Sequence, residues 1–121
     1  MAKTALVVDD SMSIRRLVGK TLQGVGFEVI EASNGQEALD RLVGRTVQLV
    51  ITDLNMPVMD GLEFIRALRD DKAQKFTPVV FLTTETDEGR MGDARSAGAT
   101  AWVVKPFHPE KILTVVQRLV P

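Results

Sequence analysis

The sequence predicts an α/β protein of the (βα)5 type, in which five parallel strands alternate with helices. Four short apolar runs rich in Val, Ile and Leu have the composition of strands buried on both faces: residues 5–8, 47–51, 79–82 and 101–104. Segments with helical hydrophobic spacing lie between these runs, and this alternation is typical of βαβ units around a parallel sheet. Each run also ends at or near an Asp, Thr or Lys, so those polar groups are expected to share one edge of the sheet.

The first helix and the strand after it follow the first apolar run. Ser11 has the chemistry of an N-cap, and two glycines, Gly24 and Gly26, are expected to end the helix. Apolar residues fall on one face of this helix, at Ile14, Leu17, Val18 and Leu22. Residues 27–32 then alternate between apolar and polar side chains, which predicts an edge strand.

The second and third helices have matching start signals. Asn34 with Glu37, and Asp60 with Glu63, have the spacing of a capping box, although the strict form begins with Ser or Thr. The third helix is expected to bury Leu62, Ile65 and Leu68 and to end in the polar stretch 70–74.

The last two helices differ in the strength of their signals. Residues 86–98 have the weakest helical pattern, because Gly89 and Gly92 each cost about 1 kcal/mol relative to Ala in a helix. We expect that helix to be the least stable. The final helix has Pro109 in its first turn and an apolar face formed by Ile112, Val116 and Leu119.

Length and composition indicate a single domain spanning residues 1–121, with no linker and no effector domain. Lys and Arg total 15 against 16 Asp and Glu, which gives a formal charge of −1 and no footprint for nucleic acid. The chain has no cysteine, which excludes disulfides and thiolate metal sites and is compatible with the cytoplasm. No segment has the length and apolarity of a signal peptide or a membrane helix, so we expect no membrane insertion.

The residues at the four strand ends form a combination suited to phosphoryl transfer: Asp9, Asp10, Asp53, Thr83 and Lys105. Three close carboxylates repel one another unless a cation lies among them, and oxygen-only ligands favour a hard ion such as Mg²⁺. An ionised Asp53 beside that metal can act as a nucleophile toward phosphorus. The ammonium of Lys105 can neutralise the transferring oxygens, and the Thr83 hydroxyl can donate to them.

Each of these residues also has an ordinary structural interpretation. A strand-end Asp is most often a turn or cap residue, and a single Lys is usually a solvated surface charge. Placement of all five at successive strand ends favours the functional interpretation. No glycine-rich phosphate loop of the flavodoxin or nucleotide-hydrolase type is found in the chain.

Over nearly its whole length the chain resembles the receiver domains of two-component response regulators. Four segments carry the resemblance: Val-Val-Asp9-Asp10, Asp53-Leu-Asn-Met-Pro57 followed by Met59-Asp60-Gly61, Phe-Leu-Thr83-Thr84, and Val-Lys105-Pro106-Phe. The resemblance implies a doubly wound, flavodoxin-like sheet with strand order 2-1-3-4-5.

The same resemblance implies a role for each residue of the site. Asp53 matches the phospho-acceptor, while Asp10, Asp53 and the backbone carbonyl of Asn55 match direct Mg²⁺ ligands. Asp9 matches the residue that holds the metal through water, and Lys105 matches the lysine that binds the phosphoryl group together with Thr83. The bond between Lys105 and Pro106 is expected to be cis.

Phosphorylation is expected to reach partners through a conformational switch formed by Thr83 and Trp102. In the family, the position of Trp102 is usually Tyr, Phe or His and follows the threonine inward. The output surface implied by the resemblance is the fourth helix, fifth strand and fifth helix. Side chains that match Asn55 and Glu85 tune the phosphoryl lifetime, and this pair resembles chemotaxis-type regulators. Leu54 departs from that type, in which Trp is common.

The sequence therefore predicts a phosphorylation-activated switch that is not an enzyme, although it catalyses its own phosphorylation and dephosphorylation. A histidine kinase or phosphotransfer protein is the expected donor, and the expected target is a downstream protein, in chemotaxis or elsewhere. One alternative is an intermediate receiver in a multi-step phosphorelay. A remote alternative is a Mg²⁺-dependent aspartyl phosphatase, whose Asp-x-Asp nucleophile pattern on the first strand is replaced here by Asp9-Asp10-Ser11. Arg15 and Arg16, on the first helix, lie beside the expected docking surface of the donor.

Overall fold

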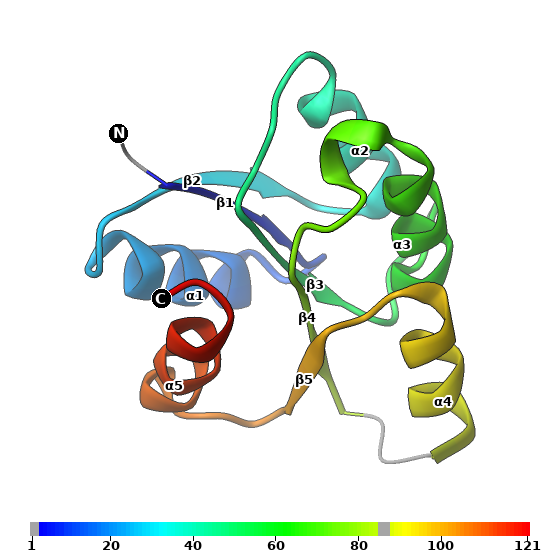
Figure 1. Ribbon diagram of the computed structural model, residues 1–121. Helices are drawn as coiled ribbons and strands as arrows, with labels where there is room; N and C mark the ends of the chain where they lie inside the picture. The colour runs from blue at the N-terminus through cyan, green and yellow to red at the C-terminus, as the bar shows by residue number, and fades with distance from the viewer. Residues whose placement is uncertain (1–2, 85–87) are drawn as a thin grey trace.

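The computed structural model describes residues 3–84 and 88–121, and its elements alternate as predicted (Figure 1). The strands are β1 (Lys3–Val8), β2 (Phe27–Ala32), β3 (Leu49–Asp53), β4 (Val79–Thr83) and β5 (Ala101–Val104). The helices are α1 (Met12–Gln23), α2 (Gly35–Leu42), α3 (Gly61–Asp70), α4 (Glu88–Ala97) and α5 (Pro109–Leu119), with a short 3₁₀ helix η1 (Lys72–Gln74) after α3.

The five strands form one parallel sheet in the order β2-β1-β3-β4-β5, which confirms the predicted topology. Helices α1 and α5 cover one face of the sheet, and α2, α3 and α4 cover the other (Figure 1). This arrangement is the doubly wound α/β fold, in which ligands bind beyond the carboxyl ends of the strands, where the strand order reverses. In this sheet that position is next to β1 and β3.

The central strands are buried on both faces because their side chains alternate between two hydrophobic cores. In β1, Ala5 and Val7 pack in the core beneath α1 and α5, whereas Leu6 and Val8 pack in the core beneath α2, α3 and α4. The same alternation continues in β3 and β4. Continuous apolar runs in the sequence thus reflect a sheet with helices on both sides.

Strand register brings the polar strand ends to one level of the sheet. Val8 pairs with Thr52, so the next residues along, Asp9 and Asp53, are neighbours across β1 and β3. On the other side, Asp53 pairs with Leu82 and Thr83 pairs with Val104, the residue before Lys105. The predicted cluster is therefore a direct consequence of parallel pairing.

The predicted caps are all present. Each of the three side chains accepts a hydrogen bond from a backbone N–H in the first turn of its helix: Ser11 from Ile14, Asn34 from Glu37, and Asp60 from Glu63. Gly24 is the C-cap of α1, as expected, and Gly26 has a φ of 98° in the turn that leads to β2. Local sequence signals therefore set the helix ends accurately.

Several details differ from the sequence-based expectations. Strands β1 and β4 extend beyond the predicted runs 5–8 and 79–82, to Lys3–Val8 and Val79–Thr83. The third strand is Leu49–Asp53 rather than 47–51, because the pairing with β4 extends to Asp53. Leu17 is exposed, since the buried stripe of α1 is narrower than its apolar stripe and consists of Val18, Gly19 and Leu22. Gln74 lies in the polar stretch after α3 but is fully buried, where its side chain bonds to the Arg45 carbonyl and the Thr77 hydroxyl.

The segment with the weakest helical signal does form a helix, α4, but it packs differently from its neighbours. Among its described side chains only Ala94 is buried. Within the described parts of the chain, no helix combines the length and apolarity needed to cross a membrane.

Candidate functional site

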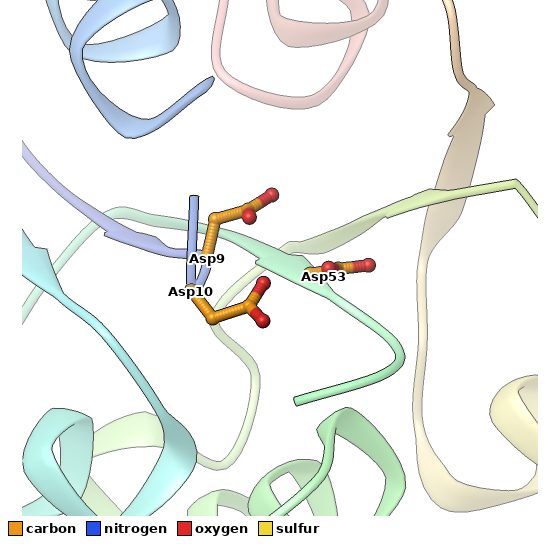
Figure 2. A group of neighbouring side chains, drawn as sticks. All are labelled: Asp9, Asp10 and Asp53. Atoms are coloured by element: carbon orange, nitrogen blue, oxygen red, sulfur yellow. The ribbon is translucent and has the colours of Figure 1, made fainter. Parts of the chain in front are cut away.

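Three carboxylates meet at the carboxyl ends of β1 and β3 and point to the same side (Figure 2). Each contributes an oxygen such that these atoms all lie within 4.8 Å of one another: Asp9, Asp10 and Asp53. Asp9 is fully buried and Asp53 is only 8% exposed, whereas Asp10 is exposed to solvent. The cluster is thus open on one side and closed by the protein on the other.

Lys105 reaches this cluster from the end of β5. Its Nζ lies 2.8 Å from Oδ2 of Asp9 and 3.4 Å from Oδ2 of Asp53. The peptide bond between Lys105 and Pro106 is cis, as predicted. One ammonium therefore bridges two of the three carboxylates, and the positive charge predicted for the site is in place.

Backbone N–H groups hold the remaining oxygens of the two buried carboxylates. Oδ1 of Asp9 accepts from the N–H of Ser11 at 2.9 Å, and Oδ1 of Asp53 accepts from the N–H of Leu54 at 2.8 Å. Arg15 binds the main chain at the same point, because its Nη1 donates to the carbonyl of Asp9 at 2.8 Å. These bonds fix the directions of both carboxylates before any ligand binds.

The pKa values in the site reflect burial and charge together. Burial raises the pKa of Asp53, and the nearby negative charge of Asp9 raises it further, against the opposing effect of Lys105. Burial alone would lower the pKa of Lys105, but the hydrogen bond to Asp9 and the charge of Asp53 outweigh burial and raise it. The lysine is therefore charged at neutral pH, and the carboxylates still repel one another.

The donor set fits a hard divalent cation. Three carboxylates offer only oxygen ligands, and one of them, Asp10, is exposed and can reorient toward an ion. Burial, and after it the negative charge of Asp9, raise the pKa of Asp53 and disfavour its ionised form, so added positive charge is favourable at this position. Mg²⁺ keeps several waters when bound, so a cluster that is open to solvent on one side suits it.

The first turn of α3 packs directly against the end of β3. The N–H of Gly61 donates to the carbonyl of Leu54 at 2.9 Å, and a Cβ at this position would lie 2.5 Å from the carbonyl oxygen of Asp53. It would also lie 2.7 Å from Cε1 of Phe81. Only glycine allows this approach. Gly61 belongs to a segment that carries the family resemblance, but no contact with Asp53 was predicted for it.

Thr83 and Trp102 lie on the α4 side of the sheet. Thr83 is buried at the end of β4, two residues after Phe81, which pairs with Trp102 across the sheet. The indole is partly buried, packs against the core on that side and lies beneath the guanidinium of Arg95, 5.1 Å from the ring centroid. The two predicted switch residues are therefore on the same face and near each other, with α4 alongside.

The remaining predicted residues have different outcomes. Asn55 is exposed in the loop after β3, and its Oδ1 accepts from Nη2 of Arg90 in α4. Glu85 lies outside the described residues.

The two arginines expected beside the donor's docking surface differ in their contacts. Arg15 bonds to the carbonyl of Asp9 and forms an ion pair with Glu31 at 3.3 Å, whereas Arg16 is exposed on α1. The contacts of Arg15 and Arg90 have no local sequence signal, because each joins elements that are distant along the chain.

This arrangement has the elements of phosphoryl transfer to a carboxylate. The carboxylate of Asp53 can act as an oxygen nucleophile, since the N–H of Leu54 fixes its direction and the cation Lys105 lies beside it. The buried Asp9 and the exposed Asp10 supply negative charge that could attract a metal ion. Electrostatic stabilisation of this kind accounts for most of the catalysis in phosphoryl transfer.

Comparisons with known proteins agree with this geometry. Residues 5–117 match the family model described as response regulator receiver domain. The chain is 40% identical over 107 residues to the chemotaxis protein CheY1 of Helicobacter pylori, covering 87% of this chain and 86% of that protein. It is 41% identical to a CheY homolog of Campylobacter jejuni, covering 87% and 82%. The structure of the chemotaxis response regulator CheY4 of Vibrio cholerae superimposes with a TM-score of 0.94 at 45% identity, covering 99% of this chain and 100% of that chain.

Proposed function

Since this chain belongs to the response regulator receiver domain family, we propose that it is a switch of a two-component chemotaxis system in which Asp53 accepts the phosphoryl group. The observation that carries the proposal is the contact of Lys105 with both Asp9 and Asp53, beside the exposed carboxylate of Asp10. A CheY-like receiver acts as a signalling switch and not as a classical enzyme.

The chemical step is the transfer of a phosphoryl group from a phosphohistidine of a kinase or phosphotransfer protein. One carboxylate oxygen of Asp53 attacks phosphorus, the new P–O bond forms, and the P–N bond breaks. The histidine nitrogen leaves with the bonding electron pair and the product is an acyl phosphate. Lys105, 3.4 Å from Oδ2 of Asp53, is placed to neutralise the negative charge on the transferring oxygens.

Mg²⁺ is the proposed cofactor. Asp10, Asp53 and the backbone carbonyl of Asn55 would hold it directly, and Asp9 would hold it through water. Bound there, the ion supplies positive charge that relieves the repulsion among the carboxylates and neutralises the phosphoryl oxygens. The raised pKa of Asp53 supports this role, because burial and the charge of Asp9 disfavour its ionised form and a cation beside it would favour that form.

The proposed signal passes from Thr83 to Trp102 and to the surface formed by α4, β5 and α5. Phosphorylation adds negative charge and three acceptor oxygens near Thr83, and movement of this side chain would open space on the α4 side of the sheet. β5 is an edge strand with α4 on one side and α5 on the other (Figure 1). A downstream protein that binds this surface would sense the change in Trp102.

Intact-mass measurement tests the acceptor. Treatment with acetyl phosphate and Mg²⁺ is expected to add a single phosphoryl group to the wild type and none to Asp53→Asn. The same experiment in a chelator should give no adduct, because the metal is needed. An unmodified wild type under conditions that preserve acyl phosphates would overturn the proposal, as would an adduct that survives Asp53→Asn.

Fluorescence tests the switch, since Trp102 is the sole tryptophan. Beryllofluoride with Mg²⁺ is expected to change its emission, whereas Mg²⁺ alone or beryllofluoride with Asp53→Asn should not produce the same change. Thr83→Ala should weaken the response while leaving phosphorylation of Asp53 in place. An emission that is unchanged by beryllofluoride would remove Trp102 from the proposed route.

A further inference from the structure

An arginine of α4 contacts the loop that follows the acceptor strand. Nη2 of Arg90 donates to Oδ1 of Asn55 at 3.3 Å, and Asn55 is only two residues after Asp53. Within the described chain, Nε of Arg90 is buried and has no hydrogen-bond partner. The guanidinium therefore extends from α4 to the loop that follows Asp53, and its Nε is not used in a hydrogen bond.

The chemistry of this contact fixes the orientation of the amide. A guanidinium has donors and no acceptor, so the end of Asn55 that faces Arg90 has to be its oxygen. An amide has only one oxygen, and Arg90 takes one of the two acceptor sites on it. While the contact persists, Asn55 has a fixed orientation and reduced capacity to accept another hydrogen bond.

Loss of the phosphoryl group from Asp53 requires a water molecule to attack phosphorus from the open side. The water oxygen forms a new P–O bond, and the bond between phosphorus and the Asp53 oxygen breaks with its electron pair returning to the carboxylate. Inorganic phosphate leaves and one proton of the water passes to solvent. An acceptor beside the site can orient the attacking water, and Asn55, two residues after Asp53, offers its Oδ1 in the loop after β3.

We propose that Arg90 is a positioning residue that prolongs the phosphorylated state by holding the Asn55 oxygen away from the attacking water. This inference rests on the proposed function of Asp53 and extends it to a residue of α4. It also connects the lifetime of the signal to the position of that helix, because movement of α4 would break the contact.

The test is the decay of the phosphorylated protein in single-turnover experiments. Arg90→Ala is expected to accelerate hydrolysis by about threefold, the size expected for one partly exposed hydrogen bond. The rate of phosphorylation by acetyl phosphate should change less than the rate of hydrolysis. Arg66→Ala is the matched control, because Arg66 is an exposed arginine on the neighbouring helix α3.

A double-mutant cycle separates positioning from charge or helix stability. In the background of Asn55→Ala, removal of Arg90 should have no further effect on hydrolysis, because the group that Arg90 positions is gone. An equal acceleration in both backgrounds would overturn the proposal, since it would show that Arg90 acts through its charge or through α4 alone. Arg90→Met, which keeps the length of the side chain, provides a second variant if Arg90→Ala disturbs folding.

A second measurement does not depend on phosphorylation. The side-chain amide resonances of Asn55 in ¹H–¹⁵N spectra of the unmodified protein are expected to shift in Arg90→Met and to stay unchanged in Arg66→Ala. Unshifted resonances in Arg90→Met would exclude the contact itself. If the resonances shift but Asp53 accepts no phosphoryl group, the proposed function fails while the contact stands. If phosphorylation occurs and hydrolysis is unaffected by Arg90→Ala, only the positioning role fails.

Discussion

Helices α3 and α4 both have ten residues and cover the same face of the sheet, yet they are held in place very differently. The N-cap Asp60 binds the first turn of α3, which buries Gly61, Leu62, Phe64, Ile65 and Leu68. Among the described side chains of α4, only Ala94 is buried. Helical propensity and burial both favour α3, and both are weak in α4.

The difference assigns separate tasks to the two helices. The first turn of α3 lies against the end of β3 at Gly61, so a rigid α3 keeps Asp53 in a fixed position. The weaker α4 borders Trp102 through Arg95 and the loop after β3 through Arg90. A helix with little buried surface has a low cost of local movement, which is what a responsive element requires.

The largest effect is expected from removing a buried aromatic side chain of α3. Phe64→Ala should lower the free energy of unfolding by about 3–5 kcal/mol, because it removes contacts in the core and leaves a cavity. Met91→Ala, at a half-buried position of α4, should cost about 1 kcal/mol or less. Urea unfolding of the two variants measures both values, and similar losses would contradict the distinction between the helices.

A smaller effect is expected at the contact between α3 and the acceptor strand. Gly61→Ala should destabilise the protein by about 1–3 kcal/mol, because the new methyl group overlaps the carbonyl of Asp53 and the ring of Phe81. It should also slow phosphorylation, since the acceptor is displaced. Denaturation and the acetyl phosphate reaction check the two effects, and a fully active Gly61→Ala would show that the site tolerates movement of α3.

The same substitution in α4 should have the opposite sign. A Cβ at Gly92 would meet no atom within 4 Å, so Gly92→Ala is expected to stabilise the protein by about 0.5–1 kcal/mol through helix propensity. Hydrogen exchange of the α4 amides should slow, while exchange in α3 stays unchanged. Unchanged exchange in α4 would mean that its opening does not depend on this glycine.

Much of the fold and of the site could be predicted because short-range rules determine them. Apolar runs between helical segments indicated a parallel sheet, and parallel strands bring their carboxyl ends to one edge. The proximity of Asp9, Asp53 and Lys105 follows from that geometry. The caps Ser11, Asn34 and Asp60 were also predictable, because a cap acts within its own first turn.

The features that could not be predicted depend on long side chains or on close packing between distant segments. The long side chains of Arg15 and Arg90 can adopt many conformations. Only the folded chain brings the Asp9 carbonyl close to Arg15 and the Asn55 amide close to Arg90. Gln74 is polar and lies between polar neighbours, so its burial is visible only once its partners are in place. The sequence around Gly61 does not indicate that the carbonyl oxygen of Asp53 packs against this glycine.

The smallest change in stability is expected from Asp53→Asn, because the unfavourable burial of the Asp53 charge and its repulsion by Asp9 are partly offset by Lys105. Burial and the charge of Asp9 raise the pKa of Asp53 in the folded protein, so ionised Asp53 makes the folded state less stable than the protonated form does. In a chelator at neutral pH, Asp53→Asn should therefore be more stable than the wild type. A less stable variant would show that the attraction to Lys105 dominates.

The pH dependence of that difference follows from the direction of the pKa shift. The penalty of ionised Asp53 is complete above its raised folded-state pKa, and it disappears as pH falls below the ordinary aspartate value of about 4. The stability advantage of Asp53→Asn should fade over that pH window.

Mg²⁺ should make the wild type more stable than Asp53→Asn at neutral pH. An ion that binds only the folded cluster stabilises the wild type more than a variant that lacks one ligand. If Mg²⁺ raised the unfolding midpoints of the wild type and of Asp53→Asn equally, the ion would bind elsewhere. The carboxylate of Asp53, which α3 keeps in position, would then not be a metal ligand.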